Sequence, residues 1–206
     1  MVGIDLERLF RAPGQVSVLR ALWSAPTPLT GRQVQQLAGV HNLTATRCLG
    51  DLEKLGLLRR RTAGRAYLYS LKRSHRVVEK LIDPLFEAEQ TAPQRFFQEL
   101  GKVLKGRCLS AIVYGSVARG KSDPGSDVDL LVVVENEQAA EQFSAATQGQ
   151  AEQLVREGWG LMLEVNIKTR HELRKLWNGP LLKQIRRDGQ LVTGKPLTEV
   201  RNGRKS

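Results

Sequence analysis

The chain reads LSAIVYGSVARGKSDPGSDVDLLVVV over residues 109–134, where two apolar segments flank a loop of Gly, Ser, Asp and Pro. The segment before Gly115 predicts a short strand, and the β-branched run over residues 128–134 predicts a strand buried in a sheet. Asp127 and Asp129 are separated by one residue at the start of the second strand, so we expect their carboxylates close together on one face. These residues predict a polar site where one strand ends and the next begins.

Two carboxylates held this close repel each other, and the arrangement favours a bound divalent cation. Magnesium is the expected ion because it prefers carboxylate oxygens and completes its coordination with substrate phosphates. Gly115 permits a close backbone approach, and Ser116 offers a hydroxyl and an amide to a phosphate oxygen. Arg119 and Lys121 add positive charge nearby. The loop thus predicts a site for magnesium and a phosphate-bearing ligand.

A third acidic residue follows in LMLEVNIKT, residues 161–169, after a predicted helix over residues 137–157. Apolar and polar residues alternate in this segment, which predicts a strand with one polar face, and Glu164 lies on that face. We expect Glu164 to point toward the aspartates. In a two-metal phosphoryl transfer, such a residue binds the second ion or accepts the proton of the acceptor hydroxyl.

The segment GSVARGKSDPGSDVDLLVV, residues 115–133, resembles the signature of the DNA polymerase β-like nucleotidyltransferase superfamily, in particular its smaller members. The resemblance extends over about residues 107–195. It implies a mixed sheet with flanking helices, an NTP donor, two Mg²⁺ ions and transfer of a nucleoside monophosphate with release of pyrophosphate. The expected nucleotide-binding residues are Gly115, Ser116, Arg119, Lys121 and Ser126. The expected metal-binding and catalytic residues are Asp127, Asp129 and Glu164.

The remainder of the C-terminal half, residues 171–197, predicts two helices separated by Gly-Pro and a short strand over residues 191–193. His171 has no evident partner in the sequence, and we interpret it as a surface residue. We interpret Lys183, Arg186 and Arg187 as a solvated face of the second helix rather than a phosphate-binding stripe.

The N-terminal third has the pattern of helices followed by a hairpin. Apolar residues at helical spacing over residues 16–23 predict a first helix, and Thr30 is expected to cap a second. The apolar repeat over residues 41–55 predicts a third helix. The alternating pattern over residues 57–71 predicts two strands that turn at Ala63-Gly64.

This order resembles a winged helix-turn-helix domain of the bacterial repressor type, including its LxxLEKLGLLRR segment at residues 49–60. The resemblance covers about the first 75 residues and implies that the third helix enters the major groove of double-stranded DNA while the hairpin contacts phosphates. Nine Lys or Arg and only two acidic residues lie between His41 and Arg76, which suits this use. Protein docking or dimerisation is the alternative use of such a domain. The expected DNA-binding residues are His41, Asn42, Thr44, Thr46, Arg47, Arg59, Arg60, Arg61 and Arg65.

Between these parts, residues 77–106 predict two helical pieces interrupted by Pro84 and Pro93. Their apolar faces are expected on the following sheet or on a second copy of the chain, and a homodimer is favoured because winged-helix proteins commonly bind two half-sites. The expected fold class is α+β. The expected parts are a winged helix-turn-helix domain over residues 1–76, a helical connector over 77–106, a nucleotidyltransferase domain over 107–197 and a basic tail over 198–206.

The composition of the 206 residues, with 41% hydrophobic and 26% charged, is that of a globular protein. The excess of 32 Lys and Arg over 21 Asp and Glu gives a net charge of +11, which favours polyanionic partners. The sequence shows neither a membrane-spanning run nor a signal-peptide pattern, so we expect a cytoplasmic protein without a membrane partner. We interpret Cys48 and Cys108 as reduced, buried residues, with a disulfide as the alternative.

The sequence as a whole favours a Mg²⁺-dependent enzyme that transfers a nucleoside monophosphate from an NTP to an acceptor and also binds DNA. RNA ends, a protein hydroxyl and a small aminoglycoside-like molecule all remain open as acceptors. The alternative is a regulator without catalysis, in which the C-terminal domain senses nucleotides or binds a partner protein, as in an antitoxin-like repressor. Superfamily members without a working third acid bind nucleotides but do not convert them, so Glu164 is the residue on which this choice depends.

Overall fold

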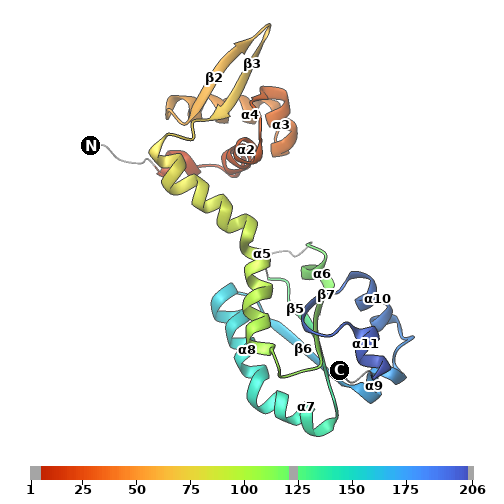
Figure 1. Cartoon of the computed structure of the whole chain (residues 1–206). Helices are drawn as coiled ribbons and strands as arrows, with labels where there is room; N and C mark the ends of the chain where they lie inside the picture. Colours follow the sequence, from red (N-terminus) through yellow and green to blue (C-terminus); the bar gives the residue numbers. More distant parts are fainter. Residues whose placement is uncertain (1–5, 121–124, 204–206) are drawn as a thin grey trace. The chain divides into compact units, whose positions relative to one another are not determined.

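The computed structural model describes residues 6–120 and 125–203, and it divides into two compact units, of which the first ends at Ala92 and the second begins at Pro93. The predicted connector, residues 77–106, is therefore shared between the units. Figure 1 shows the elements along the chain. Those of the first unit are α1 (Leu6–Phe10), α2 (Pro13–Ser24), β1 (Leu29–Thr30), α3 (Gly31–Ala38), α4 (Asn42–Lys54), β2 (Leu58–Ala63), β3 (Ala66–Leu71) and the π-helical turn η1 (Val78–Ile82).

The first unit has the helices and the hairpin that the apolar spacing predicts. Thr30 caps α3 as predicted, because its hydroxyl accepts the Gln33 amide at 3.3 Å and the Gln33 side chain accepts the Thr30 amide at 2.8 Å. The three strands are ordered β1-β3-β2, and all are antiparallel. Apolar side chains of α2, α3 and α4 form the core, with Leu19, Val34 and Leu52 buried at its centre. Membership of the winged-helix family stays a prediction.

The helix over residues 78–104 is not interrupted at Pro84 or Pro93, although the sequence predicts a break at each proline. Residues 78–104 are helical throughout, as η1 followed directly by α5 (Asp83–Leu104). Pro84 lies just after the π-helical turn η1, and such a turn is a place where a helix accommodates a residue without an amide hydrogen. Pro93 lies inside α5, at the boundary between the units, and buried Phe86 and Phe96 anchor the helix on either side of it. This burial offsets the cost of an internal proline, about 3 kcal/mol.

The second unit is built on a four-stranded mixed sheet with the order β6-β5-β4-β7, in which β5 and β6 are parallel and the other pairs antiparallel. The expected α+β class and the mixed sheet with flanking helices are confirmed. The elements are β4 (Ser110–Tyr114), α6 (Gly115–Ala118), β5 (Val128–Val134), α7 (Glu137–Phe143), η2 (Ser144–Gln148), α8 (Gly149–Gln153), η3 (Leu154–Gly158), β6 (Leu163–Thr169), α9 (Arg170–Lys175), α10 (Pro180–Asp188), β7 (Gln190–Gly194) and α11 (Leu197–Asn202).

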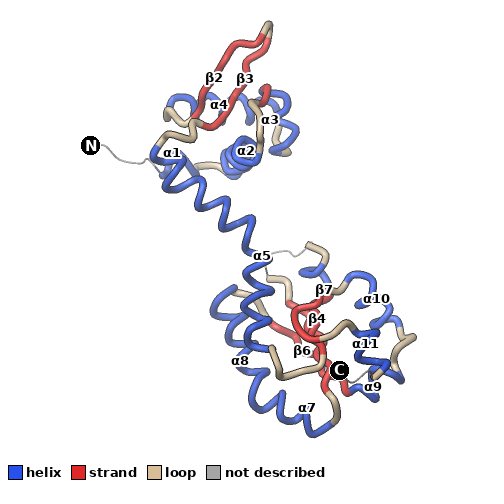
Figure 2. Tube along the Cα trace, viewed as in Figure 1, coloured by secondary structure: helices blue, strands red, loops and turns tan. Residues whose placement is uncertain are grey.

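Helices cover both faces of this sheet, as the tube view in Figure 2 shows. On one face, Val113, Val132 and their neighbours pack against the end of α5 and the helical run from α7 to η3. On the other face, Ile112, Leu131 and Val133 pack against α9, α10 and α11. Successive side chains of a strand point to opposite faces of the sheet. Because both faces are buried here, all of these residues are apolar.

Two further features complete the fold. Residues 198–202, expected in a basic tail, belong to α11, because Leu197 and Val200 are buried against the sheet and hold this segment as a helix. Both cysteines are free, with Cys48 buried and Cys108 half-buried.

Within the described residues, no helix has the length and apolar character needed to cross a membrane.

Candidate active site and nucleic-acid interface

Three polar side chains form a row across three neighbouring strands of the second unit. Tyr114 at the end of β4 is paired with Asp129 of β5, and Asp129 is paired with Glu164 of β6. Paired residues on neighbouring strands project from the same face of a sheet. That face is the one covered by α9–α11, because Tyr114 packs against the same apolar cluster as Leu131. Glu164 therefore lies on the face of Asp129, one strand away.

Asp129 lies directly against Gly115, where β4 passes into the short helix α6. The φ angle of Gly115 is +76°, in the left-handed region that disfavours side chains. A Cβ at this position would lie 3.1 Å from Asp129 Cγ and would overlap its Oδ2. Glycine thus serves two purposes here, since it permits the turn and leaves room for the carboxylate.

The charges around Asp129 are coupled. Asp129 is half-buried, whereas Asp127 and Arg119 are exposed. Burial raises the pKa of Asp129 above its ordinary value, the negative charge of Asp127 raises it further, and Arg119 partly lowers it. The two carboxylates and the guanidinium therefore lie within electrostatic reach of one another, as a site for a cation and a phosphate requires.

Tyr114 and Asn166 belong to this site although the sequence analysis missed them. Burial raises the pKa of Tyr114, and the negative charges of Asp129 and, less strongly, Glu164 raise it further. A hydrogen bond with the Asn166 side chain lowers this pKa. The Tyr114 hydroxyl thus lies within electrostatic reach of both acidic side chains. The available signals were the position of Tyr114 directly before Gly115 and the place of Asn166 on the polar face of its strand.

The other predicted nucleotide-binding residues belong to the segment between β4 and β5. Ser116 and Ser126 are half-buried, and Gly115 is buried. The pKa of Asp188 is lowered, mainly by its hydrogen bonds with Arg187 and in addition by the positive charge of Arg119. Arg119 therefore also lies near Asp188. Lys121 lies outside the described residues.

The donor set of this site fits Mg²⁺. Asp127 and Asp129 provide hard oxygen ligands whose mutual repulsion a cation would relieve, and magnesium is often held by one or two carboxylates plus substrate phosphates. Among the residues that the structure describes, no three His, Cys, Asp or Glu side chains lie close enough together to hold a metal ion by themselves. The aspartate pair would therefore depend on phosphate oxygens to complete the coordination of the ion.

In the first unit, the start of α4 presents polar side chains at the surface. His41 caps the helix, since its Nδ1 accepts the Leu43 amide at 3.4 Å. His41, Asn42 and Arg47 are exposed. Leu43 is 54% exposed beside them and was missed by the sequence analysis, although an apolar contact of this kind can read a thymine methyl group.

Two threonines of α4 differ in their surroundings. Thr46 is exposed and donates a hydrogen bond of 3.0 Å to the Asn42 carbonyl. Thr44 is half-buried, and a Cβ on Gly14 would lie 2.8 Å from its methyl group. Thr44 therefore packs against α2, and it is the one predicted DNA-binding residue of α4 that is turned toward the core.

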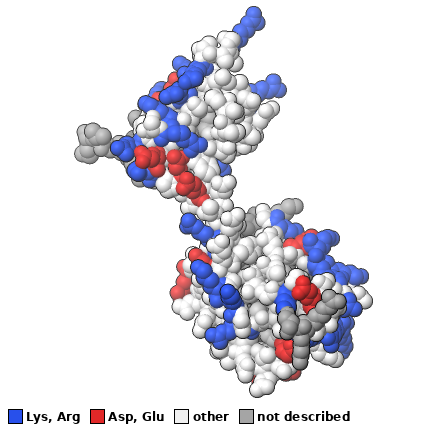
Figure 3. Space-filling model, in the orientation of Figure 1, with Lys and Arg blue, Asp and Glu red and all other residues white. Residues whose placement is uncertain are grey.

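The hairpin of β2 and β3 is exposed from Arg59 to Tyr67. Arg60 is held in place, because its Nε lies 3.1 Å from Glu53 Oε1 and its guanidinium carbon lies 4.6 Å from the centroid of the Tyr67 ring. Arg59 and Arg61 project from the opposite side of the ribbon, since side chains alternate along a strand. Figure 3 shows Lys and Arg side chains along the hairpin and the neighbouring surface. The exposed arginines are Arg59, Arg60, Arg61 and Arg65.

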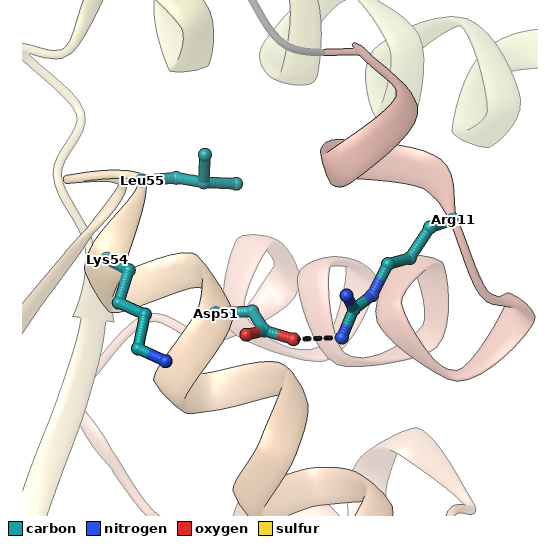
Figure 4. Close-up of a pocket in the computed structure, with 4 residues that line it drawn as sticks. All are labelled: Arg11, Asp51, Lys54 and Leu55. Atoms are coloured by element: carbon teal, nitrogen blue, oxygen red, sulfur yellow. Dashed lines mark hydrogen bonds and ion pairs between the residues drawn. The ribbon is translucent and has the colours of Figure 1, made fainter.

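A small pocket of 150 Å³ in the first unit is lined by Arg11, Asp51, Lys54 and Leu55 (Figure 4). Arg11 Nη2 donates a hydrogen bond to Asp51 Oδ2 across it. This ion pair ties the residue after α1 to α4. We assign the pocket a role in packing, because the Arg11–Asp51 ion pair spans it.

Residues 95–192 match the family model described as Nucleotidyltransferase domain. The match begins within α5, ends within β7 and includes the Gly115 turn, the aspartate pair and Glu164. A search of curated proteins found none that matches the chain. The second unit is thus similar in sequence to nucleotidyltransferase domains over its sheet and its candidate active site.

Proposed function

We propose, from this match and the geometry it encloses, that the second unit transfers a nucleoside monophosphate from an NTP to an acceptor hydroxyl. The observation that supports the proposal most directly is the Asp129 carboxylate, which lies against Gly115 with Asp127 and Arg119 in electrostatic reach. Such a combination of paired carboxylates, a glycine turn and a guanidinium suits a metal-bound triphosphate.

Each residue of the site then has a distinct role. Gly115 and Ser116 bind the triphosphate, Arg119 balances its charge, and Asp127 and Asp129 hold Mg²⁺. When bound, Mg²⁺ would supply positive charge that stabilises the negative charge developing on the leaving pyrophosphate. The acceptor oxygen attacks the α-phosphorus in line, the bond from that phosphorus to the bridging oxygen breaks, and pyrophosphate leaves. Glu164, exposed in the same row, accepts the hydroxyl proton.

The test is incubation of the protein with α-labelled NTPs and Mg²⁺, with and without cell extract. We expect label to be transferred by the parent protein and not by Asp127→Ala/Asp129→Ala. The matched control is Glu141→Gln, an exposed acid of α7 on the opposite face of the sheet, which should label as the parent does. Equal labelling by the aspartate variant would refute the proposal.

Glu164→Gln should lower the rate of transfer about 100-fold, the loss expected for a general base, and leave the affinity for NTP unchanged. The amide has the shape of the carboxylate but cannot accept the proton. Single-turnover rates and equilibrium NTP binding measure the two quantities separately. A rate equal to that of the parent would show that Glu164 has no part in the proton transfer.

A nucleotide-sensing regulator without catalysis is the second candidate function. The observation in its favour is that Glu164 does not form a closed three-carboxylate metal site with the aspartates in the described residues. This regulator would bind NTP with no transfer of label, and NTP would change its affinity for DNA. The labelling assay and a DNA-binding assay with and without NTP therefore distinguish the two functions.

We further propose that the first unit binds double-stranded DNA, with the start of α4 at base edges and the hairpin at phosphates. Arg59→Gln/Arg61→Gln should weaken DNA binding about 10-fold or more and lower the salt slope of log Kd by about 2, because two phosphate contacts are lost. Fluorescence anisotropy over a salt series measures both effects. Arg76→Gln/Lys80→Gln removes the same charge from residues paired with Glu79, and its smaller effect is the control. Identical losses in both variants would contradict a specific role for the hairpin.

A further inference from the structure

Two arginines of the second unit lie over one buried tryptophan, and a third arginine is hydrogen-bonded to the backbone of one of them. Trp177 is 8% exposed, and the guanidinium carbons of Arg186 and Arg201 lie 4.2 and 4.7 Å from its ring centroid. These are cation–π contacts, which hold a guanidinium in place. Arg174 joins them, because its Nε donates a hydrogen bond of 2.8 Å to the Arg201 carbonyl. Helices α9, α10 and α11 thus each contribute one positioned guanidinium, and Arg174, Arg186 and Arg201 are called the arginine set below.

Other arginines nearby have acidic partners, but the arginine set has none in the part of the chain that the structure describes. Arg187 donates to both carboxylate oxygens of Asp188 at 2.8 Å, and Arg170 lies 2.8 Å from Glu135. Positive charges held together without a counter-charge attract an anion. The planar donors of arginine fit phosphate oxygens especially well. The arginine set therefore has the chemistry of a phosphate site, and Arg186 is exposed, as the sequence suggested.

The charge of the two helical layers differs in sign. Residues 170–202, which include α9–α11, contain eight Lys or Arg and three Asp or Glu. Residues 137–158, on the other face of the sheet, contain four Glu and one Arg. Figure 3 shows blue side chains gathered where Figure 1 places α9 and α10. The basic layer covers the same face of the sheet that contains Asp129 and Glu164.

A groove with an apolar floor adjoins the arginine set. It has a volume of 290 Å³ and lies between α10, β7 and the start of α11. Its floor is formed by apolar side chains, and Arg186 stands at its edge; Leu191, which also lines it, is 46% exposed. A nucleic-acid base that has left its stack finds apolar contacts and a guanidinium plane in such a groove.

We propose that the arginine set and this groove bind single-stranded nucleic acid, with a phosphodiester at Arg174, Arg186 and Arg201 and the neighbouring base in the groove. A duplex is excluded from this mode because its bases are stacked and paired. A run of acidic residues would match the charge, but carboxylates would gain nothing from the apolar groove. We propose that the bound strand is also the acceptor, which rests on the proposed transferase function. A cationic aminoglycoside-like acceptor is disfavoured, because the basic layer would repel it.

The test measures binding of a short fluorescein-labelled oligouridine to the full chain by anisotropy, without NTP or metal. All proteins contain Arg59→Gln/Arg61→Gln, so that the hairpin does not hold the strand. Adding Arg186→Gln/Arg201→Gln should weaken binding about 10- to 100-fold, since two charge-assisted contacts are lost, and should lower the salt slope by about 1 to 2. The control Lys102→Gln/Lys105→Gln removes two exposed charges at the end of α5 and directly after it. This helix packs on the opposite face, so the control should change affinity less than about twofold.

Because the double arginine variant loosens the packing of Trp177, Leu191→Glu provides a second measurement. This exposed position lines the groove, and a carboxylate there should repel the strand and weaken binding by at least about 10-fold. Inorganic phosphate, UMP, polyglutamate and duplex DNA serve as competitors, and the proposal requires all four to compete more weakly than unlabelled oligouridine. Unchanged binding in Leu191→Glu, or equal competition by any of the four, overturns it. Since no transfer is measured, the result stands whether or not the labelling assay succeeds.

Discussion

Asp129→Asn is expected to lower nucleotidyl transfer about 1,000-fold, because a bound metal ion contributes several kcal/mol to the stabilisation of the transition state and each 1.36 kcal/mol is a factor of ten. The amide keeps the shape of the side chain but removes the charge that, with Asp127, holds Mg²⁺. Single-turnover transfer over a series of Mg²⁺ concentrations measures the loss. A variant that regains the parent rate at high Mg²⁺ would show that Asp129 contributes only affinity for the ion.

The same substitution should stabilise the fold at neutral pH, which separates loss of chemistry from loss of structure. Burial and Asp127 raise the pKa of Asp129 in the folded chain, so ionisation of this carboxyl costs more in the folded state than in the unfolded state. With EDTA present, Asp129→Asn should therefore have the larger free energy of unfolding above the folded pKa. The difference should vanish below the unfolded pKa, about 3.9, where both states are protonated. Denaturant melts at two pH values measure this.

Gly115→Ala should lower transfer about 100-fold, because its methyl group would displace the Asp129 carboxylate and a shift of about 1 Å in a catalytic group has an effect of that size. It should also destabilise the fold by about 1–3 kcal/mol, the cost of a left-handed alanine. Transfer rates and thermal melts are the measurements.

Gly106→Ala is the matched control for this effect. Gly106 has a similar φ of +74°, but a Cβ there would meet nothing within 4 Å. Its substitution should therefore cost the backbone strain alone and leave transfer unchanged. If the two alanine variants lose equal activity, the strain and not the contact with Asp129 is responsible.

Local patterns along the sequence predict most of the fold. Apolar spacing predicts α2 and α4, the side chain of Thr30 predicts the start of α3, and alternation predicts the hairpin. These features depend on neighbours within about one helical turn or one strand, so the sequence shows them directly. Pro93 is the exception, because its tolerance depends on burial of Phe86 and Phe96 rather than on adjacent residues.

The candidate active site is readable from the sequence only in part. Gly115, Asp127 and Asp129 lie within 15 residues of one another, and their chemistry follows from their types and order. Tyr114 and Asn166 were missed because the register of β4, β5 and β6 brings them to the acidic row. The sequence did not reveal the arginine set, because its members lie on three helices and come together only in the folded chain.

The amino-acid sequence alone thus determined the α+β class, the order of the elements and the paired aspartates beside a glycine turn, because these are properties of residues close together in the chain. The tertiary structure decided that Glu164 shares a face with Asp129, that Asp129 lies on Gly115, and that two guanidiniums lie over one indole ring while Arg174 bonds to the Arg201 carbonyl. Strand register and helix packing set these contacts, and both arise from burying the two faces of one sheet, which no local pattern encodes.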